Sequence, residues 1–405
     1  MKTLTALLAA TLLSPLAIAQ TVPVQPVSVA VSPATSAADA APVYRPTSLV
    51  ADATVPRTAD GRPDLQNAVW AANYFGMLEA APMMLPPELT LPEDKAKAAF
   101  DKMMLMMSNS PQMKAMIDAD PEAAELFRNF QGFPVVRGER RTRLIVLPAD
   151  GKLPYTPEAR KKATDPGLTK SDNPEDRSLG ERCLSMGGEA PMAFISPMHP
   201  RQMVQTRDHM VINTEYGDEA RIIRFASAHR SPVVPTQMGD GIARWEGDTL
   251  VIETTGFAAN NLKRFTFPAS LLLTQTSKVI ERYTRISKDE LIYQFTIEDP
   301  ALYAAPWMAE YSLFRAGFRM YPSGCHEGNY SLPNILAGQR TIDIRRMQAF
   351  KPNDVNGDNK LDLEEFKKLM TSTGATGQLE PAFKRRDTNA DGFITAQELN
   401  AEVKL

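Results

Sequence analysis

Cysteine, histidine and long apolar runs are all scarce in this chain of 405 residues. The two cysteines and four histidines are scattered and form no zinc-ligand cluster, and there is no HExxH motif. The chain also lacks a Gly-rich phosphate loop and a serine nucleophile elbow. Beyond the N-terminal segment, no run is apolar for long enough to cross a bilayer. These absences predict a protein with no membrane span and no familiar catalytic motif.

An excess of charge of either sign is missing as well. The formal net charge is −3, from 45 basic and 48 acidic residues, and there is no basic stripe or lysine-rich tail. Affinity for nucleic acid depends on clustered Lys and Arg side chains that neutralise phosphates. We therefore expect no nucleic-acid partner.

The N-terminus has the features of an export signal. Met1-Lys2 gives a positive start, an apolar run follows from Leu4 to Leu13, and Ala17-Ile18-Ala19 forms a small-x-small cleavage site. A membrane anchor is the competing interpretation, but the apolar run is short for a bilayer. We predict a signal peptide over residues 1–19 and a periplasmic or secreted mature protein. Residues 20–56 are rich in Pro, Ala, Val, Thr and Ser, which predicts a disordered leader.

The expected compartment bears on whether the two cysteines form a disulfide. An oxidising space permits a disulfide, and Cys183 and Cys325 form the only possible pair. We predict that they are bonded; two unpaired buried thiols are the alternative.

Residues 57–340 are predicted to form a β-rich main domain with a helical segment at about 92–130. Short hydrophobic runs separated by polar turns indicate consecutive hairpins. The predicted strands cover residues 143–147, 203–205, 210–215, 220–225, 241–245, 249–255, 278–286, 291–298 and 308–315. Such an antiparallel meander closes naturally into a barrel, because closure removes exposed edges. We expect a lipocalin-like barrel within an α+β multidomain chain.

Several phrases of this domain resemble an uncharacterised family of exported bacterial proteins. The resemblance covers roughly residues 57–340 and implies a single domain there, without implying a catalytic residue. The phrases are Asp60-Gly61-Arg62-Pro63-Asp64-Leu65, Leu153-Pro154-Tyr155-Thr156-Pro157-Glu158-Ala159, Glu181-Arg182-Cys183-Leu184, Arg244-Trp245-Glu246-Gly247-Asp248-Thr249-Leu250, Glu298-Asp299-Pro300 and Cys325-His326-Glu327-Gly328-Asn329-Tyr330.

Two places in the main domain offer side chains for acid–base chemistry. His326 is next to Glu327, a pair that could exchange a proton with a substrate, although flanking glycines favour a plain polar loop. Glu246 and Asp248 are two residues apart, but Gly247 between them favours a hairpin turn with both carboxylates solvated. The catalytic residues, if any, are therefore unknown, and the sequence leans away from an enzyme.

The C-terminal residues carry the most specific pattern. A calcium loop of twelve residues supplies oxygen ligands from positions 1, 3, 5, 7 and 9, and a bidentate Glu at position 12. The loop that starts at Asp387 fits throughout, with Gly392 at the sharp turn of position 6 and Ile394 as the apolar residue at position 8. Its predicted ligands are Asp387, Asn389, Asp391, the main-chain carbonyl of Phe393, Thr395 and Glu398.

A second loop starts 33 residues earlier and departs from the pattern once. Position 6 holds Asn359 in place of glycine, and asparagine is the next best residue for a left-handed backbone. Leu361 takes the apolar position 8, where it would pair with Ile394. Its predicted ligands are Asp354, Asn356, Asp358, the main-chain carbonyl of Lys360, Asp362 and Glu365. Residues 345–405 thus resemble an all-α EF-hand pair that binds two Ca²⁺ ions.

Two functional hypotheses follow from these patterns. In the first, the protein is an exported calcium-binding protein whose β domain binds a small ligand or a partner. In the second, it is an exported hydrolase or lyase that acts on a carbohydrate-like substrate, with calcium as a structural cofactor. A cleft around His326 would favour the second, and a dry apolar barrel interior would favour the first.

Overall fold

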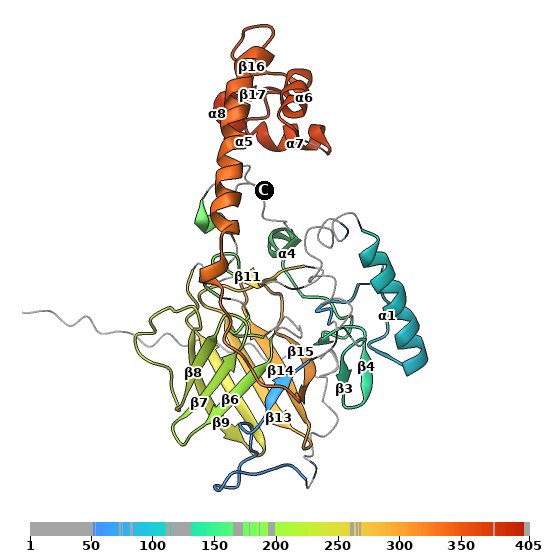
Figure 1. Cartoon of the computed structure of the whole chain (residues 1–405), viewed down its shortest axis with the longest axis vertical. Coiled ribbons are helices and arrows are strands. Elements are labelled where there is room, and N and C mark those ends of the chain that lie inside the picture. The colour runs from blue at the N-terminus through green and yellow to red at the C-terminus, as the bar shows by residue number, and fades with distance from the viewer. Residues whose placement is uncertain are drawn as a thin grey trace, which may run out of the picture. The chain divides into compact units, whose positions relative to one another are not determined.

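A computed structural model shows the fold of the chain (Figure 1). It describes residues 52–400 except 53, 73, 75, 82–83, 111–113, 115–129, 131, 165–172, 178, 186, 193–198, 260–262, 265, 267–268 and 376. The predicted signal peptide and nearly all of the predicted leader lie outside the described residues.

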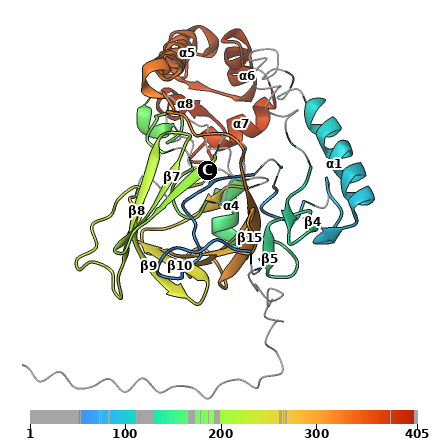
Figure 2. The same cartoon turned by 60° about the horizontal axis from the view of Figure 1, so that its bottom comes forward.

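The strands of the main domain curl into a β-barrel (Figures 1 and 2). Their pairings close nine strands into a complete ring. Its strands lie in the order β1-β6-β7-β8-β9-β10-β13-β14-β15, and β1 closes it by pairing with both β6 and β15. The strands are β1 (Val69–Ala71), β6 (Arg201–Gln205), β7 (His209–Thr214), β8 (Glu219–Phe225), β9 (Asp240–Glu246), β10 (Thr249–Thr255), β13 (Lys278–Arg285), β14 (Glu290–Glu298) and β15 (Trp307–Arg315). The predicted barrel is therefore confirmed.

The hairpins form where polar turns interrupt alternating runs. Glu246 pairs with Thr249 across a two-residue turn in which Gly247 has a φ of +59°, a conformation that glycine adopts without strain. β13 and β14 pair from Lys278↔Glu298 to Arg285↔Leu291. Inward-facing residues of the barrel strands build one hydrophobic core, which includes Trp307 of β15 and Phe295 of β14.

The barrel departs from a simple meander at one pairing. β8 and β9 are parallel, through Arg224↔Ile242 and Phe225↔Ala243, and residues 226–239 connect them. The other barrel pairings are antiparallel, as predicted. A further short strand, β5 (Ile145–Leu147), pairs with β15 at Met308 and Ala309.

Several small elements accompany the barrel. The helix α1 (Glu93–Ser108) covers the first half of the predicted helical segment, and Phe100 packs against Phe133 in a separate apolar cluster. Most of the rest of that segment lies outside the described residues. The others are β2 (Thr90–Leu91), β3 (Val135–Val136), β4 (Glu139–Arg141), α4 (Pro157–Thr164), η1 (Pro174–Asp176), β11 (Lys263–Arg264) and β12 (Leu271–Leu272).

Cys183 and Cys325 form the predicted disulfide, with Cα atoms 5.7 Å apart. The short helix η2 (His326–Gly328) follows the second cysteine directly. The bond links residues 142 positions apart. It therefore ties the end of the main domain to the segment that precedes β6.

The C-terminal segment is helical, with one short two-stranded sheet. It contains α5 (Ser331–Asn353), β16 (Lys360–Leu361), α6 (Leu363–Ser372), α7 (Leu379–Arg386), β17 (Ile394–Thr395) and α8 (Ala396–Asn400). Its own hydrophobic core holds Phe366 and Phe383 in an edge-to-face contact with ring centroids 5.4 Å apart. Across the described residues, no helix has the length and apolar character needed to cross a membrane.

Candidate metal centre

The loop from Asp387 to Glu398 folds its polar side chains inward against its own backbone. Asp387 Oδ1 and Oδ2 accept hydrogen bonds from the amides of Asp391 (3.0 Å) and Gly392 (2.9 Å). Asn389 Oδ1 accepts from the same Asp391 amide at 2.9 Å, and Asp391 Oδ1 accepts from the Phe393 amide at 3.0 Å. The three side chains at positions 1, 3 and 5 therefore converge on one side of a tight turn.

The loop from Asp354 to Glu365 repeats this arrangement. Asp354 Oδ1 and Oδ2 accept from the amides of Asp358 (3.1 Å) and Asn359 (2.9 Å). Asn356 Oδ1 accepts from the Asp358 amide, and Asp358 Oδ1 accepts from the Lys360 amide, both at 2.9 Å. The same four hydrogen bonds thus shape both loops.

The glutamate at position 12 spans each loop. Glu365 Oε1 accepts from the Val355 amide at 2.8 Å, and its Oε2 accepts from the Asp362 amide at 3.0 Å. Glu398 makes the equivalent bonds to the amides of Thr388 (3.1 Å) and Thr395 (3.0 Å). Each carboxylate is thereby held across the loop, opposite the side chains of positions 1, 3 and 5.

Glu398 is buried, yet it is held in its charged form. Burial acts to raise the pKa of this carboxyl, but hydrogen bonds from Thr395 and Thr388 outweigh that effect. The pKa of Glu398 therefore lies below its ordinary value. A carboxylate that is already ionised and oriented is suited to bind a cation.

The turns of both loops require a left-handed backbone at positions 4 and 6. At position 6, Asn359 has a φ of +61° and Gly392 a φ of +84°, as the sequence pattern predicts. Position 4 is Gly357 in the first loop, with a φ of +72°, and Ala390 in the second, with a φ of +57°. Each loop therefore has one glycine and one residue with a side chain at these two positions.

The loops are joined back to back by a two-residue antiparallel sheet. Leu361 pairs with Ile394 and Lys360 with Thr395, so the two position-8 residues meet as predicted. Both of these apolar side chains are fully buried in the C-terminal core. The sheet therefore links the geometry of one loop to that of the other.

One side chain crosses from the first loop to the second. Lys360 Nζ lies 2.9 Å from Asp391 Oδ2 and 5.3 Å from the centre of the Phe393 ring. The hydrogen bond from this ammonium lowers the pKa of Asp391, and the carboxylate in turn raises the pKa of Lys360. The sequence pattern gave no sign of this contact, because it concerns a residue whose expected role is a main-chain carbonyl.

The donor set of the two loops fits a hard cation. Carboxylates, side-chain amides and main-chain carbonyls are the oxygen ligands that Ca²⁺ takes in numbers of six to eight. Across the described residues, no three His, Cys, Asp or Glu side chains cluster closely enough to hold a metal by themselves. The predicted sites accordingly depend on amide and main-chain oxygens as well as on carboxylates.

A comparison with protein families matches this part of the chain. The family model described as EF hand matches residues 347–370 and 379–404, which contain both loops. The C-terminal segment is an EF-hand pair. No curated protein and no solved structure matches the chain. The resemblance of residues 57–340 to a family of exported bacterial proteins therefore stays a prediction.

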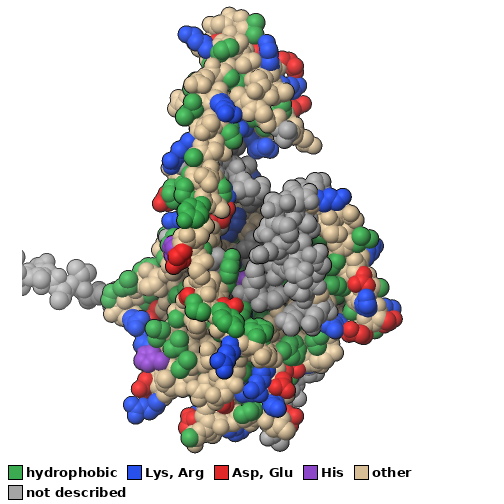
Figure 3. Space-filling view, in the orientation of Figure 1, with side chains coloured by type: hydrophobic (Ala, Val, Ile, Leu, Met, Phe, Trp, Pro, Cys, Tyr) green, Lys and Arg blue, Asp and Glu red, His purple; other side chains and the backbone are tan. Residues whose placement is uncertain are grey.

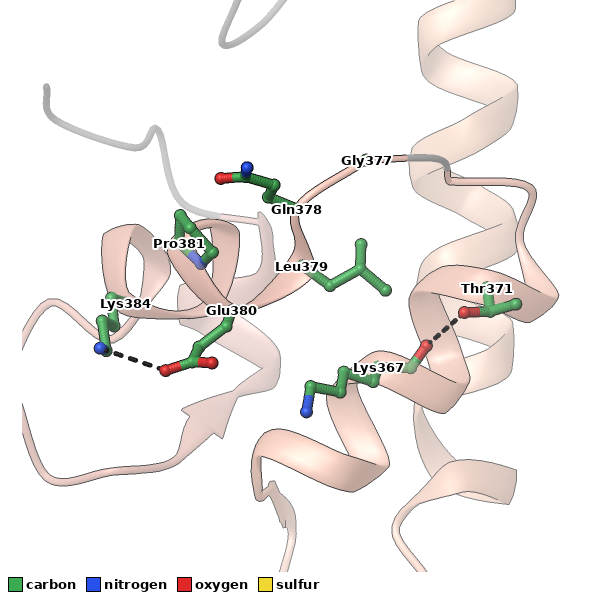
Figure 4. Close-up of a pocket in the computed structure, with 8 residues that line it drawn as sticks. All are labelled: Lys367, Thr371, Gly377, Gln378, Leu379, Glu380, Pro381 and Lys384. Atoms are coloured by element: carbon green, nitrogen blue, oxygen red, sulfur yellow. Dashed lines mark hydrogen bonds and ion pairs between the residues drawn. The ribbon is translucent and has the colours of Figure 1, made fainter.

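A shallow hollow of about 740 Å³ lies beside the linker of the EF-hand pair (Figure 4). Lys367 and Thr371 of α6 form one side, and Glu380 and Lys384 of α7 form the other. The lining is mixed, because Leu379 and Pro381 add apolar surface. On the face drawn in Figure 3, acidic and basic side chains are interspersed over the molecule.

The acid–base candidates of the main domain do not assemble into a site. His326 and Glu327 are exposed, and a neighbouring hollow of about 370 Å³ beside the disulfide is lined by other residues. Glu246 forms ion pairs with Arg244 and Arg282. The Arg57 guanidinium pairs with both oxygens of Asp248 and holds its pKa below the ordinary value.

A cluster that the sequence did not reveal lies where β8 and β9 meet. His229 Nδ1 is 2.9 Å from Asp240 Oδ2, and its Nε2 is 3.3 Å from Glu253 Oε1. Asp240 also accepts hydrogen bonds from Arg224 and Arg230. These groups come from β8, β9, β10 and the loop 226–239. Because their partners are distant in sequence, no local pattern predicts the cluster.

The barrel interior is polar at one place, contrary to a dry apolar lumen. Glu281 accepts hydrogen bonds from the buried Arg221 and from the hydroxyls of Tyr283 (3.2 Å) and Tyr293 (2.7 Å). Burial raises the pKa of both tyrosines. The Met192 amide donates to the Tyr293 hydroxyl, and the Tyr311 hydroxyl donates to the Met192 carbonyl.

Proposed function

We propose that this protein binds two Ca²⁺ ions, one in each loop of its EF-hand pair. The proposed ligands of the first loop are Asp354, Asn356, Asp358, the Lys360 carbonyl, Asp362 and Glu365. Those of the second are Asp387, Asn389, Asp391, the Phe393 carbonyl, Thr395 and Glu398. The observation that carries the proposal is that two loops 33 residues apart repeat the same side-chain-to-amide bonds, each closed by a buried glutamate.

The loops should prefer Ca²⁺ to Mg²⁺ because of the larger size of the Ca²⁺ ion and its preference, as a hard cation, for oxygen ligands. Ca²⁺ accepts a flexible shell of oxygens at 2.3–2.6 Å and tolerates a bidentate carboxylate, whereas Mg²⁺ demands a compact octahedron. A glutamate held across the loop by two amides is placed to offer both of its oxygens to one ion. If the protein is exported, as we also propose, even sites with a Kd of about 10⁻⁴–10⁻³ M would fill.

For the barrel, we propose a ligand- or partner-binding role, with calcium ions stabilising the attached pair. The alternative of a hydrolase or lyase that acts on a carbohydrate-like substrate rested on His326, and that side chain is exposed outside the neighbouring hollow. Neither His326 nor Glu327 lines the hollow beside the disulfide. The position of His326 favours a binding role over an enzyme, while the polar group around Glu281 shows that the interior is not the dry apolar lumen expected for that role.

Calorimetry on the purified protein tests the calcium sites. We expect heat for about two ions per chain in the native protein and loss of one ion in Glu398→Gln or Glu365→Gln. Loss of such a ligand should weaken its site by more than the roughly 10- to 100-fold that removal of a second-shell partner costs.

The matched control is Glu364→Gln, which neutralises the neighbouring, exposed glutamate at position 11. This variant should bind two ions with affinities within about twofold of the native values, since an exposed ion pair contributes little. Absence of calcium heat in the native protein, or equal effects of Glu364→Gln and Glu365→Gln, would contradict the proposal.

Export has its own test. We expect the protein expressed with residues 1–19 in a bacterium to be recovered outside the cytoplasm, with Gln20 as its first residue, because Ala17 and Ala19 flank the cleavage point. N-terminal sequencing of the recovered protein measures this directly. An intact Met1 on protein that stays in the cytoplasm would show that the signal is wrong.

A further inference from the structure

Lys360 takes part in both calcium loops at once. Its main-chain carbonyl is the proposed position-7 ligand of the first loop, while its side chain reaches the second. The reach is possible because the paired strands place Lys360 opposite Thr395, two residues beyond Phe393. From there the Nζ atom comes to 2.9 Å from Asp391 Oδ2, at position 5 of the second loop.

Both oxygens of Asp391 are therefore engaged. Oδ1 accepts the Phe393 amide at 3.0 Å, and Oδ2 accepts the Lys360 ammonium. The ammonium is held from a second direction by the face of the Phe393 ring, 5.3 Å from its centre. A cation that binds through Asp391 must compete with this ammonium, which remains tethered beside the site even after it is displaced.

The two loops differ sharply in this respect. The first offers four proposed carboxylate ligands, and among the described residues none of them forms an ion pair. The second offers three, and one of the three is paired with Lys360. Calcium affinity rises with the number of charged ligands, so the pairing widens a difference that the ligand count already creates.

We propose that Lys360 is a built-in competitor that lowers the Ca²⁺ affinity of the second loop, so that the first loop fills first. The inference rests on the proposed calcium binding. It adds a residue that sets the order in which the sites fill. In this arrangement the ammonium holds the second loop together while the ion is absent.

Every protein in this test carries Glu365→Gln, which abolishes calcium binding by the first loop. The titration therefore reports on the second loop alone. Calcium titrations then compare the Glu365→Gln protein with versions that also carry Lys360→Gln or Lys367→Gln. Removal of a positive charge next to a divalent ion should tighten calcium binding about three- to tenfold for Lys360→Gln. The gain should shrink as the salt concentration rises, because screening weakens the repulsion.

Lys367→Gln is the matched control, because Lys367 pairs at 2.7 Å with Glu364 on the exposed side of α6 and not with a proposed ligand. This variant should bind Ca²⁺ in the second loop with an affinity within about twofold of the Glu365→Gln protein. Unchanged or weaker binding in Lys360→Gln, or an equal gain in Lys367→Gln, would overturn the proposal while calcium binding itself stands. No calcium binding in the native protein would overturn both.

Filling can also be followed loop by loop in the native protein. The amides of Asn359 and Gly392 each donate to the position-1 aspartate of their own loop at 2.9 Å, so their NMR signals report the two sites separately. We expect the Asn359 signal to change at a lower calcium concentration than the Gly392 signal. In Lys360→Gln the two calcium concentrations should become more alike. A Gly392 signal that titrates first in the native protein would overturn the proposed order.

Discussion

Position 4 of the two calcium loops holds different residues in the same left-handed conformation. Gly357 adopts it without strain, whereas the Cβ atom of Ala390 is pressed toward neighbouring backbone. At position 6 the roles reverse, with Asn359 in the first loop and Gly392 in the second. Each loop thus carries backbone strain at one of its two sharp turns.

Ala390→Gly should relieve that strain in the second loop. A left-handed residue with a side chain costs about 1–2 kcal/mol, and the extra freedom of glycine in the unfolded chain returns about 0.5–1 kcal/mol of this. We expect the free energy of local unfolding to rise by about 0.5–1 kcal/mol, measured from hydrogen exchange of the Ile394 amide.

Ala382→Gly in α7 is the control of opposite sign. Ala382 lies in a helix, where glycine is unfavourable by about 1 kcal/mol, so the same substitution there should lower protection of the Ile394 amide. Equal effects of the two substitutions would show that the conformation of Ala390 is not the cause.

Sequence spacing was sufficient to propose the calcium ligands, because an EF-hand loop is a local structure. The ligand positions, the turn residue and the apolar position 8 all lie within twelve residues of one another. Lys360 and His229 could not be found in this way. Their partners come from another loop or another strand, and only the fold determines which side chains meet.

At the scale of elements, the hairpins and the closed barrel were predictable, but the strand that closes the barrel was not. β9 with β10 and β13 with β14 follow from alternation around a short polar turn. β1 has only three residues, too few for any periodic signal, yet it closes the barrel between β6 and β15. The parallel pairing of β8 with β9 also depends on contacts across a long connection.

Asp240 fixes that connection at the start of β9. Burial acts to raise the pKa of this carboxyl, but hydrogen bonds from His229, the Arg230 amide and Arg224 outweigh it, so the pKa lies below its ordinary value of 3.8. A carboxyl whose folded-state pKa is depressed stabilises the fold fully above its unfolded pKa. The contribution is lost as the pH falls through the lower, folded-state pKa.

We therefore expect Asp240→Asn to lower the free energy of unfolding by about 1–3 kcal/mol at neutral pH, as for other buried hydrogen-bonded groups. The difference in the free energy of unfolding between variant and native protein should become smaller as the pH falls below about 4. Urea unfolding at pH 7 and at pH 3 measures both values.

Asp208→Asn serves as the reference, because the Asp208 side chain is 65% exposed. Asp208→Asn should change the free energy of unfolding by no more than about 0.5 kcal/mol at either pH. A gap for Asp240→Asn that stays constant or widens in acid would contradict the assigned role of the carboxylate.

At the scale of the whole molecule, the disulfide is the longest-range constraint. It closes a ring between Cys183 and Cys325 that contains β6 to β15, which is every barrel strand except β1. In the chain-entropy model, closing 142 residues stabilises the folded state by about 5 kcal/mol. The size of the ring, more than local contacts, sets this value.

Replacement of both cysteines by serine should lower the free energy of unfolding by about 2–5 kcal/mol. Thermal unfolding followed by barrel tryptophan fluorescence measures the loss. A reducing agent should lower the Tm of the native protein to that of the variant and leave the variant unchanged. A variant as stable as the native protein would show that the ring contributes nothing.

The same ring determines what a protease can release. A single cut in the largely exposed connection 226–239 leaves both pieces linked through Cys183 and Cys325, so no fragment separates until the bond is reduced. A cut among the exposed residues 326–328 lies outside the ring and breaks the covalent link between the EF-hand pair and the barrel. A single cut by a protease can therefore release the EF-hand pair, whereas the disulfide keeps the cut barrel in one covalent piece.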